Sequence, residues 1–386
     1  MTAESLQYRN VSESTSIPPA VIDRRYSWLN RFSWFTTVAT LILICSGGMV
    51  TSKGVGLAVP DWPTSFGYNM FLFPISKWVG GIFFEHTHRL IASTVGFMTI
   101  ILAIWIWRAD SRRWLRNLCF AALGAVIIQG VLGGLRVTLL KDEIGIFHAC
   151  LAQAYLGMLV LITLATSQLW RRIVVGTARC AVRAPLEAPS SAILRTPQRG
   201  AATRTLARVV ICTTIFVYLQ LGLGATMRHQ HRDLSILDFP AAYGRIIPDT
   251  SAAKLAKINA WREARALSDV TPFQIWLQMT HRFVALIIAT GVIASLFLSR
   301  RSGPEAGMLS RFADLWFLLL CCQITLGAWV IWSNKAADIA TAHVAVGATM
   351  LALGIALSAV CLRIMRVNES ATLTRESPVP LEIPVS

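Results

Sequence analysis

Long apolar stretches separated by short charged segments dominate this chain. Eight runs carry few charged residues: 34–52, 86–107, 117–139, 148–169, 208–227, 276–299, 313–333 and 341–362. About 20 apolar residues in a helix are enough to cross the hydrocarbon core of a bilayer. The pattern therefore predicts an all-α polytopic membrane protein with eight transmembrane helices, whose first partner is the lipid bilayer.

Composition supports this interpretation. Hydrophobic residues make up 54% of the 386 residues and charged residues only 15%, whereas a soluble domain has about 25% charged residues. The net charge of +16 would suggest nucleic acid binding in a soluble protein. Here the arginines lie in short segments between apolar runs without interleaved aromatic residues, so they indicate topology and headgroup contact, and no nucleic acid partner is expected.

The positive residues also predict the orientation. They cluster in the N-terminal tail, in 108–116, in 171–206 and in 300–311, whereas the opposite short loops hold only Lys141 and Lys335. Cytoplasmic loops carry the excess of lysine and arginine. We therefore expect both termini in the cytoplasm, and the loops 53–84 and 228–275 on the outer side.

The two halves of the chain repeat each other. DWPTSFG at 61–67 matches DFPAAYG at 238–244 with an offset of 177 (238 − 61), and further matches are Gly47 with Gly224, His88 with His281, Gln129 with Gln323, Gly133 with Gly327 and His148 with His343. The offset rises to 193 at His281 (281 − 88), which places 16 extra residues in the second outer loop. The repeat predicts two four-helix bundles related by a pseudo-two-fold axis along the membrane normal.

This repeat sets the expected domain limits. They are a cytoplasmic tail (1–33), an N-terminal four-helix unit (34–170), an Arg-rich cytoplasmic linker without helical periodicity (171–206), a C-terminal four-helix unit (207–363) and a cytoplasmic tail (364–386).

Four of the seven histidines take part in the repeat. His88, His148, His281 and His343 each lie at the outer end of the second or fourth helix of a unit. Two imidazoles that face each other across a four-helix bundle can hold a haem iron, whereas a zinc site needs three or four protein ligands. The alternative is four core histidines bonded to nearby backbone.

The remaining histidines and the cysteines carry less information. His86 points to nearly the opposite helix face from His88 and corresponds to Met279, while His229 and His231 are expected to be solvated side chains of the outer loop. The eight cysteines form no metal-binding spacing, and we interpret them as small packing residues.

Charged residues next to the histidines differ between the halves. Arg89 and Arg282 follow the two histidines in both halves and are candidates for haem propionates or for lipid headgroups. Glu85 lies three residues before His88, on the same helix face, whereas the second half has Gln278. A carboxylate in only one of two matched sites indicates a catalytic acid, base or electrostatic stabiliser.

Together, the Glu-x-x-His-Arg motif at 85–89, the histidine pairs, the DWP loop and the 4 + 4 repeat resemble haem A synthase, the cytochrome oxidase assembly factor 15 family, over about residues 34–362. The resemblance implies oxidation of a methyl group of haem O to the formyl group of haem A. It implies that His281 and His343 ligate haem b, that His88 and His148 flank haem O, and that Glu85 assists at the methyl group.

The same resemblance implies a bacterial inner-membrane location with the haem sites near the outer face, and haem O synthase and oxidase assembly factors as partners. The sequence has no flavin or nicotinamide motif, so the electron acceptor is expected to be an unidentified partner or the haem itself. Some bacterial members have a cysteine pair in the first outer loop, but residues 53–84 and 228–275 contain no cysteine. The alternatives are a di-haem b-type electron-transfer cytochrome, which leaves Glu85 unexplained, and a transporter or haem chaperone, which leaves the histidine pairs unexplained.

Overall fold

Eight long helices form most of the computed structural model, which describes residues 24–173, 190–230, 234–301 and 306–376. They are α2 (Arg24–Ser52), α3 (Gly80–Ala109), α4 (Arg113–Leu139), α5 (Asp142–Thr166), α7 (Ser190–His229), α9 (Pro272–Ser299), α10 (Ala306–Trp332) and α11 (Ala337–Glu376). In the described part of the chain, eight helices are long and apolar enough to span a membrane. The predicted multi-pass all-α fold is confirmed.

The helices extend beyond the apolar runs that predicted them. α3 begins at Gly80 and α5 at Asp142, six residues before the predicted starts. α5 gains a polar first turn with Asp142 and Glu143, whereas the added start of α3 is mostly apolar and extends the predicted run. α5 ends at Thr166, since Ser167 has an extended backbone. Within the predicted linker (171–206), residues 171–173 and those from Ser190 onward, where α7 begins, are helical, and residues 174–189 lie outside the described ranges.

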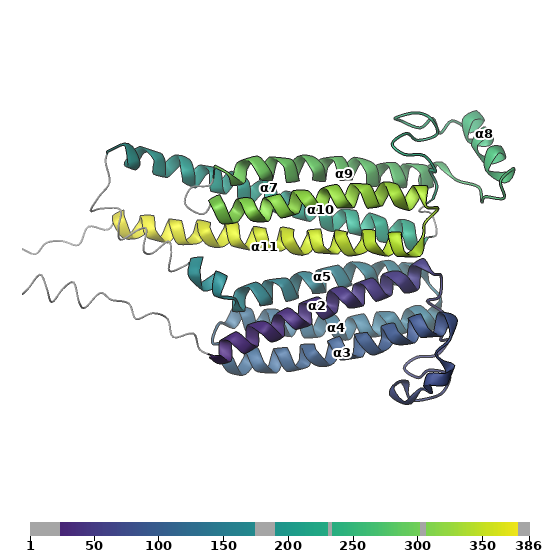
Figure 1. Ribbon diagram of the computed structural model, residues 1–386, viewed down its shortest axis with the longest axis horizontal. Coiled ribbons are helices and arrows are strands. Elements are labelled where there is room, and N and C mark those ends of the chain that lie inside the picture. The colour runs from purple at the N-terminus through teal and green to yellow at the C-terminus, as the bar shows by residue number, and fades with distance from the viewer. Residues whose placement is uncertain (1–23, 174–189, 231–233, 302–305, 377–386) are drawn as a thin grey trace, which may run out of the picture.

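The helices pack as two four-helix bundles that lie side by side (Figure 1). α2, α3, α4 and α5 form one ring of neighbouring contacts, and α7, α9, α10 and α11 form the other. The bundles meet where α2 and α5 contact α11 and where α5 contacts α7. The pseudo-two-fold axis between them stays a prediction.

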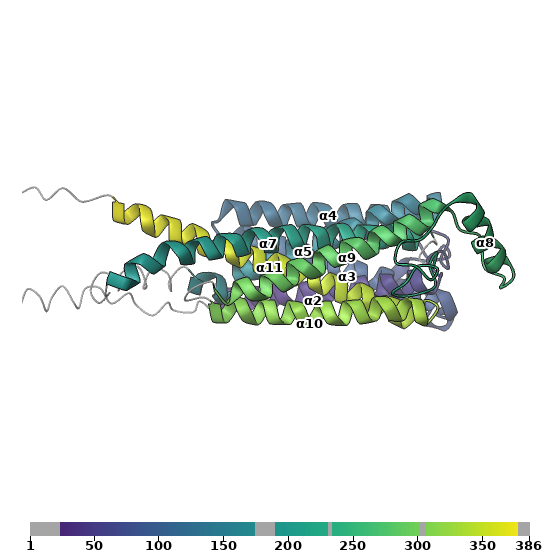
Figure 2. The ribbon, with the colours of Figure 1, turned by 90° about the horizontal axis from the view of Figure 1, so that it is seen from above.

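The outer loops share one end of both bundles, which we name the loop end; it carries Ser52, Gly80, His229 and Pro272. The first residues of α2 and α7 and the last residues of α11 lie at the opposite end (Figure 1). The first loop contains the short helices η1 (Met70–Leu72) and η2 (Ile75–Lys77). In the second loop, the 12-residue helix α8 (Ala252–Glu263) projects beyond the bundles (Figure 2) and lies in the segment that contains the 16 inserted residues.

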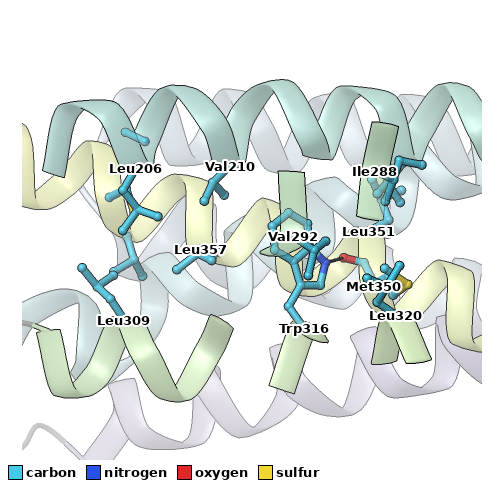
Figure 3. Packing of buried hydrophobic residues seen from close by; sticks show 14 of the residues in the cluster. Leu206, Val210, Ile288, Val292, Leu309, Trp316, Leu320, Met350, Leu351 and Leu357 are labelled. Carbon is cyan, nitrogen blue, oxygen red and sulfur yellow. Dashed lines mark hydrogen bonds between the residues drawn. The ribbon is translucent and has the colours of Figure 1, made fainter. Parts of the chain in front are cut away.

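Buried hydrophobic clusters fill the half of each bundle away from the loop end. In the C-terminal bundle, the fully buried Trp316 of α10 donates an indole hydrogen bond to the carbonyl of Met350 on α11 at 3.0 Å (Figure 3). Leu206, Leu309 and Leu357 belong to the same cluster (Figure 3). The N-terminal cluster likewise runs through Val95–Ile106, Leu115–Ala125 and Tyr155–Ala165. The four repeated histidines lie in the loop-end halves of the bundles, outside these hydrophobic clusters.

The repeat extends to the backbone of the two outer loops. The Asp61 carboxylate accepts hydrogen bonds from the amides of Phe66 (2.6 Å) and Gly67 (2.9 Å). Asp238 accepts the same bonds from Tyr243 (2.8 Å) and Gly244 (2.9 Å). Gly67 and Gly244 have φ of +77° and +76°, a conformation that favours glycine. The Asp-x-Pro…Gly motif therefore encodes a self-capped turn in both halves.

Candidate functional site

Each repeated histidine lies against a glycine of the neighbouring helix in its own bundle. A Cβ placed on Gly47 of α2 would lie 2.9 Å from Cε1 of His88, and one on Gly133 of α4 would lie 3.4 Å from Cε1 of His148. The corresponding distances are 3.6 Å for Gly224 and His281, and 3.0 Å for Gly327 and His343. The repeat therefore places four imidazoles in four similar recesses, because glycine lets the ring approach the helix backbone.

The structure brings the histidines together in the predicted pairs. The imidazoles of His88 and His148 lie within electrostatic range of each other, as do those of His281 and His343. All four Nδ1 atoms are buried without a hydrogen-bond partner among the described residues. The Nδ1 atoms of these four rings therefore do not bond to nearby backbone, as the alternative of core histidines would require.

Glutamine side chains contact three of these four histidines. Gln129 donates to the carbonyl of His148 at 3.0 Å, and Gln220 donates to the carbonyl of His281 at 2.8 Å. Gln323 lies 3.4 Å from Nε2 of His343. These contacts fix the helices that present the imidazoles, as supporting groups around a bound metal usually do.

This donor set fits a haem. Each unit offers two imidazoles, which is the axial ligand set of a six-coordinate haem iron. No group of three or more potential metal-ligating side chains occurs among the residues the structure describes, and a zinc site would need such a group. The unpaired Nδ1 atoms and the glycine recesses are the structural observations on which this fit rests.

Arg89 and Arg282 hold the outer loops. Arg89 donates to the carbonyls of Asp61 (2.7 Å), Thr64 (3.1 Å) and Val59 (2.9 Å), and it forms an ion pair with Glu85 at 2.8 Å. Four of its five N–H donors are thus engaged. In the same way, Arg282 donates to the carbonyls of Asp238 (2.7 Å), Pro240 (3.2 Å) and Ala241 (2.8 Å). Propionate binding by either arginine stays a prediction, and the structure assigns both a loop-anchoring role.

Glu85 and Gln278 anchor the same point of the two loops. Glu85 is 4% exposed, and its Oε2 accepts from the amide of Val59 at 2.9 Å. Gln278 is 5% exposed, accepts from the amide of Ile236 at 2.7 Å and donates to the Ile236 carbonyl at 3.2 Å. The two side chains therefore share a structural role and differ in charge. The catalytic role of Glu85 stays a prediction.

The other histidines differ from expectation or lie outside the described residues. His86 is fully buried, packs against Phe73 and Trp78 with ring centroids 5.0 and 4.8 Å away, and lies 3.3 Å from the Ser65 hydroxyl. The prediction that His229 is a solvated loop side chain is wrong. His229 ends α7 and is 7% exposed, because its ring packs against Gly145 of α5. His231, like Cys180, lies outside the described ranges.

Sequence reasoning missed Arg136 on α4. This cation lies one helical turn beyond Gly133, toward the loop end, and the repeat places Val330 at the equivalent position (136 + 194). The comparison that singled out Glu85 against Gln278 would have found it. Arg136 lies within electrostatic range of both His88 and His148.

Known proteins are similar to this chain over most of its length. A family model described as cytochrome oxidase assembly protein matches residues 30–355. Among similar curated proteins, the haem A synthase of Alkalihalophilus pseudofirmus is 24% identical over 318 residues, which cover 82% of this chain and 91% of that protein. The haem A synthase of Rhodopseudomonas palustris is 26% identical over 350 residues, covering 83% of this chain and 86% of that protein. Because the family model spans most of the chain, the predicted resemblance is confirmed, and the protein belongs to the cytochrome oxidase assembly protein family that includes haem A synthases.

Proposed function

We propose that this protein is a haem A synthase, which oxidises a methyl group of haem O to a formyl group. This conversion removes four electrons and adds one oxygen atom, so it needs an electron acceptor. One observation carries the proposal. Two matched histidine pairs lie against glycines in two bundles, but the acidic Glu85 of the first unit stands where the second unit has the neutral Gln278.

The two pairs take different roles in this proposal. His281 and His343 hold haem b in the C-terminal unit, and His88 and His148 flank haem O in the N-terminal unit. The bound iron porphyrins supply the redox chemistry. The glycine recesses orient the imidazoles, and the glutamine contacts keep the helices in register.

Glu85 provides the charge that differs between the sites. Arg89 and the Val59 amide hold its carboxylate in place, one helical turn before His88. A carboxylate held in this way can accept a proton from the reacting carbon or stabilise positive charge that develops there. Gln278 holds the equivalent loop but has no charge to contribute.

The proposal places the protein in the bacterial inner membrane, with both termini in the cytoplasm and the loop end on the outer side. The arginine-rich ends of the helices favour this orientation. Haem O synthase, as the source of the substrate, and oxidase assembly factors, as recipients of haem A, are the proposed partners.

Expression of the chain together with a haem O synthase tests the proposal. Pigments extracted from the purified protein should contain haem b together with haem O or haem A, and the cells should accumulate haem A. Haem b alone would support a di-haem electron-transfer cytochrome instead, and the absence of haem would support a transporter.

A further inference from the structure

Arg136 is a cation of the N-terminal unit with no counterpart in the C-terminal unit. It lies in the last turn of a membrane-spanning helix, α4, where the repeat has Val330. An arginine at such a helix end commonly extends to the membrane interface, so the neighbours of its guanidinium group decide what it does.

The position of Arg136 is well defined by its neighbours. A Cβ placed on Gly56 of the first outer loop would lie 3.2 Å from its Nη1, and one on Gly145 of α5 would lie 3.2 Å from its Nε. The guanidinium group is therefore enclosed between the loop and the start of α5. Glu85 and Asp142 attract its charge, and His88 and His148 lie within its electrostatic range.

Arg136 nevertheless forms no side-chain hydrogen bond or ion pair with another described residue. This distinguishes it from Arg89 and Arg282, whose guanidinium groups bind loop carbonyls, and from Arg112, which binds Asp110 at 2.6 Å. A partly buried guanidinium group with free N–H donors is complementary to a carboxylate, which it can bind in a bidentate manner.

We propose that Arg136 binds a propionate carboxylate of the porphyrin in the N-terminal unit and thereby sets the rotation of the macrocycle between His88 and His148. This inference rests on the proposed function. α4 runs toward the loop end, so three residues beyond Gly133 place Arg136 about 4.5 Å farther along the helix axis than the recess of His148. A carboxylate bound by Arg136 would lie at the polar mouth of the bundle. The anionic phosphate of a lipid headgroup has related chemistry and is the competing source.

Binding of haem O and of its dimethyl ester to the purified full-length protein tests the inference, with difference absorbance as the readout. The ester keeps the iron, the ring and the tail but lacks both negative charges. We expect the wild-type protein to bind haem O at least tenfold more tightly than the ester. Equal affinities of the wild-type protein would overturn the inference without any variant.

Arg136→Leu should weaken haem O binding at least tenfold and leave ester binding within twofold, whereas Arg136→Lys should retain part of the preference for haem O. Arg113→Leu, at the exposed inner end of the same helix, is the matched control and should change neither affinity.

Equal losses for both ligands in Arg136→Leu would indicate a structural role. No loss for either, together with altered binding to vesicles of anionic lipid, would assign Arg136 to a headgroup. Charge-selective binding of haem O without haem A formation in cells would refute the proposed function and leave this inference standing.

Discussion

The two histidine sites at the loop end of this protein share a framework and differ in a few polar residues. Both have two imidazoles in glycine recesses and an arginine that binds the carbonyls of an Asp-capped loop. The N-terminal site adds the charges of Glu85 and Arg136, where the C-terminal site has Gln278 and Val330. A duplicated framework can hold the same kind of group twice. The C-terminal site has an unmatched cation of its own, Arg228, near His343, where the first half has Thr51, so in the proposed function it is the carboxylate of Glu85 that marks the N-terminal copy as the reactive one.

Each long loop covers the loop end of its own bundle as a cap, and the two caps show the same contrast. In the first, the buried His86 packs against Phe73 and Trp78 and approaches Ser65. In the second, the equivalent residues are Met279 and Ala242, which join an apolar cluster with Ile258 of α8. The inserted helix thus gives the C-terminal cap a hydrophobic core of its own, whereas the N-terminal cap keeps a polar group beside Glu85.

The largest expected effect separates the two histidine pairs. His281→Ala or His343→Ala should abolish the b-type absorbance spectrum of the purified protein, because each removes one of two axial ligands. His88→Ala should leave this spectrum in place while haem O accumulates. Retention of the spectrum in both C-terminal variants would place haem b elsewhere.

The next effect tests the charge of Glu85. Glu85→Gln should lower haem A formation by roughly 10²- to 10⁴-fold, as loss of a general acid or base does. The loop should stay in place, because Gln278 already holds the equivalent loop with an amide. Haem O and haem A in whole-cell extracts are the readout, and haem b content shows that the variant folds.

Glu85→Ala provides the matched control, since it removes the loop anchor as well as the charge. It should reduce haem b content or thermal stability in addition to haem A formation. Unchanged haem A output in Glu85→Gln would refute the catalytic assignment and leave Glu85 as a loop anchor, like Gln278.

A smaller effect compares two glycine recesses. Gly47→Ala brings a methyl group to 2.9 Å from His88, whereas Gly224→Ala leaves 3.6 Å to His281. Overpacking of this kind costs about 1–3 kcal/mol, so Gly47→Ala should lower haem O affinity about tenfold. Gly224→Ala should leave the b-type spectrum unchanged. Equal effects in the two variants would mean that the recesses do not position the imidazoles.

The smallest effect lies outside both sites and separates stability from function. Asp110, which follows α3 at the end opposite the loops, is 3% exposed and binds Arg112. Burial disfavours its charged form, but hydrogen bonds from Arg112 and Tyr26 outweigh this and lower the pKa of Asp110 to about 2. Asp110→Asn should reduce the free energy of unfolding by about 1–3 kcal/mol, without changing the ratio of haem O to haem A.

The pH dependence follows from the direction of that shift. The pKa of Asp110 is lower in the folded protein than its ordinary value of 3.8, so its ionised form stabilises the fold above about pH 4. That contribution should be lost as the pH falls from about 4 toward 2, and thermal melts in detergent at several pH values measure it. Asp110→Asn should melt with a flatter pH profile over this range. An identical profile would show that Asp110 is not responsible.

The sequence alone determined the eight helices, the two units and the four repeated histidines. A long apolar run predicts a membrane-spanning helix from local sequence alone, and a tandem repeat is detected from nearly constant offsets between matching residues. Neither inference requires knowledge of contacts between distant residues. The same offsets contained the difference between Arg136 and Val330. It becomes informative once the guanidinium group is seen near His88 and His148 without a hydrogen-bond partner among the described residues.

Only the tertiary structure decided what the polar residues around the histidines contact. Arg89 binds carbonyls 25 to 30 residues earlier in the chain, and His229 ends one bundle but packs on Gly145 of the other. Such contacts depend on how the outer loops fold back over the helix ends and on how the bundles meet. No local pattern encodes that geometry, because it results from packing between segments that are far apart in the sequence.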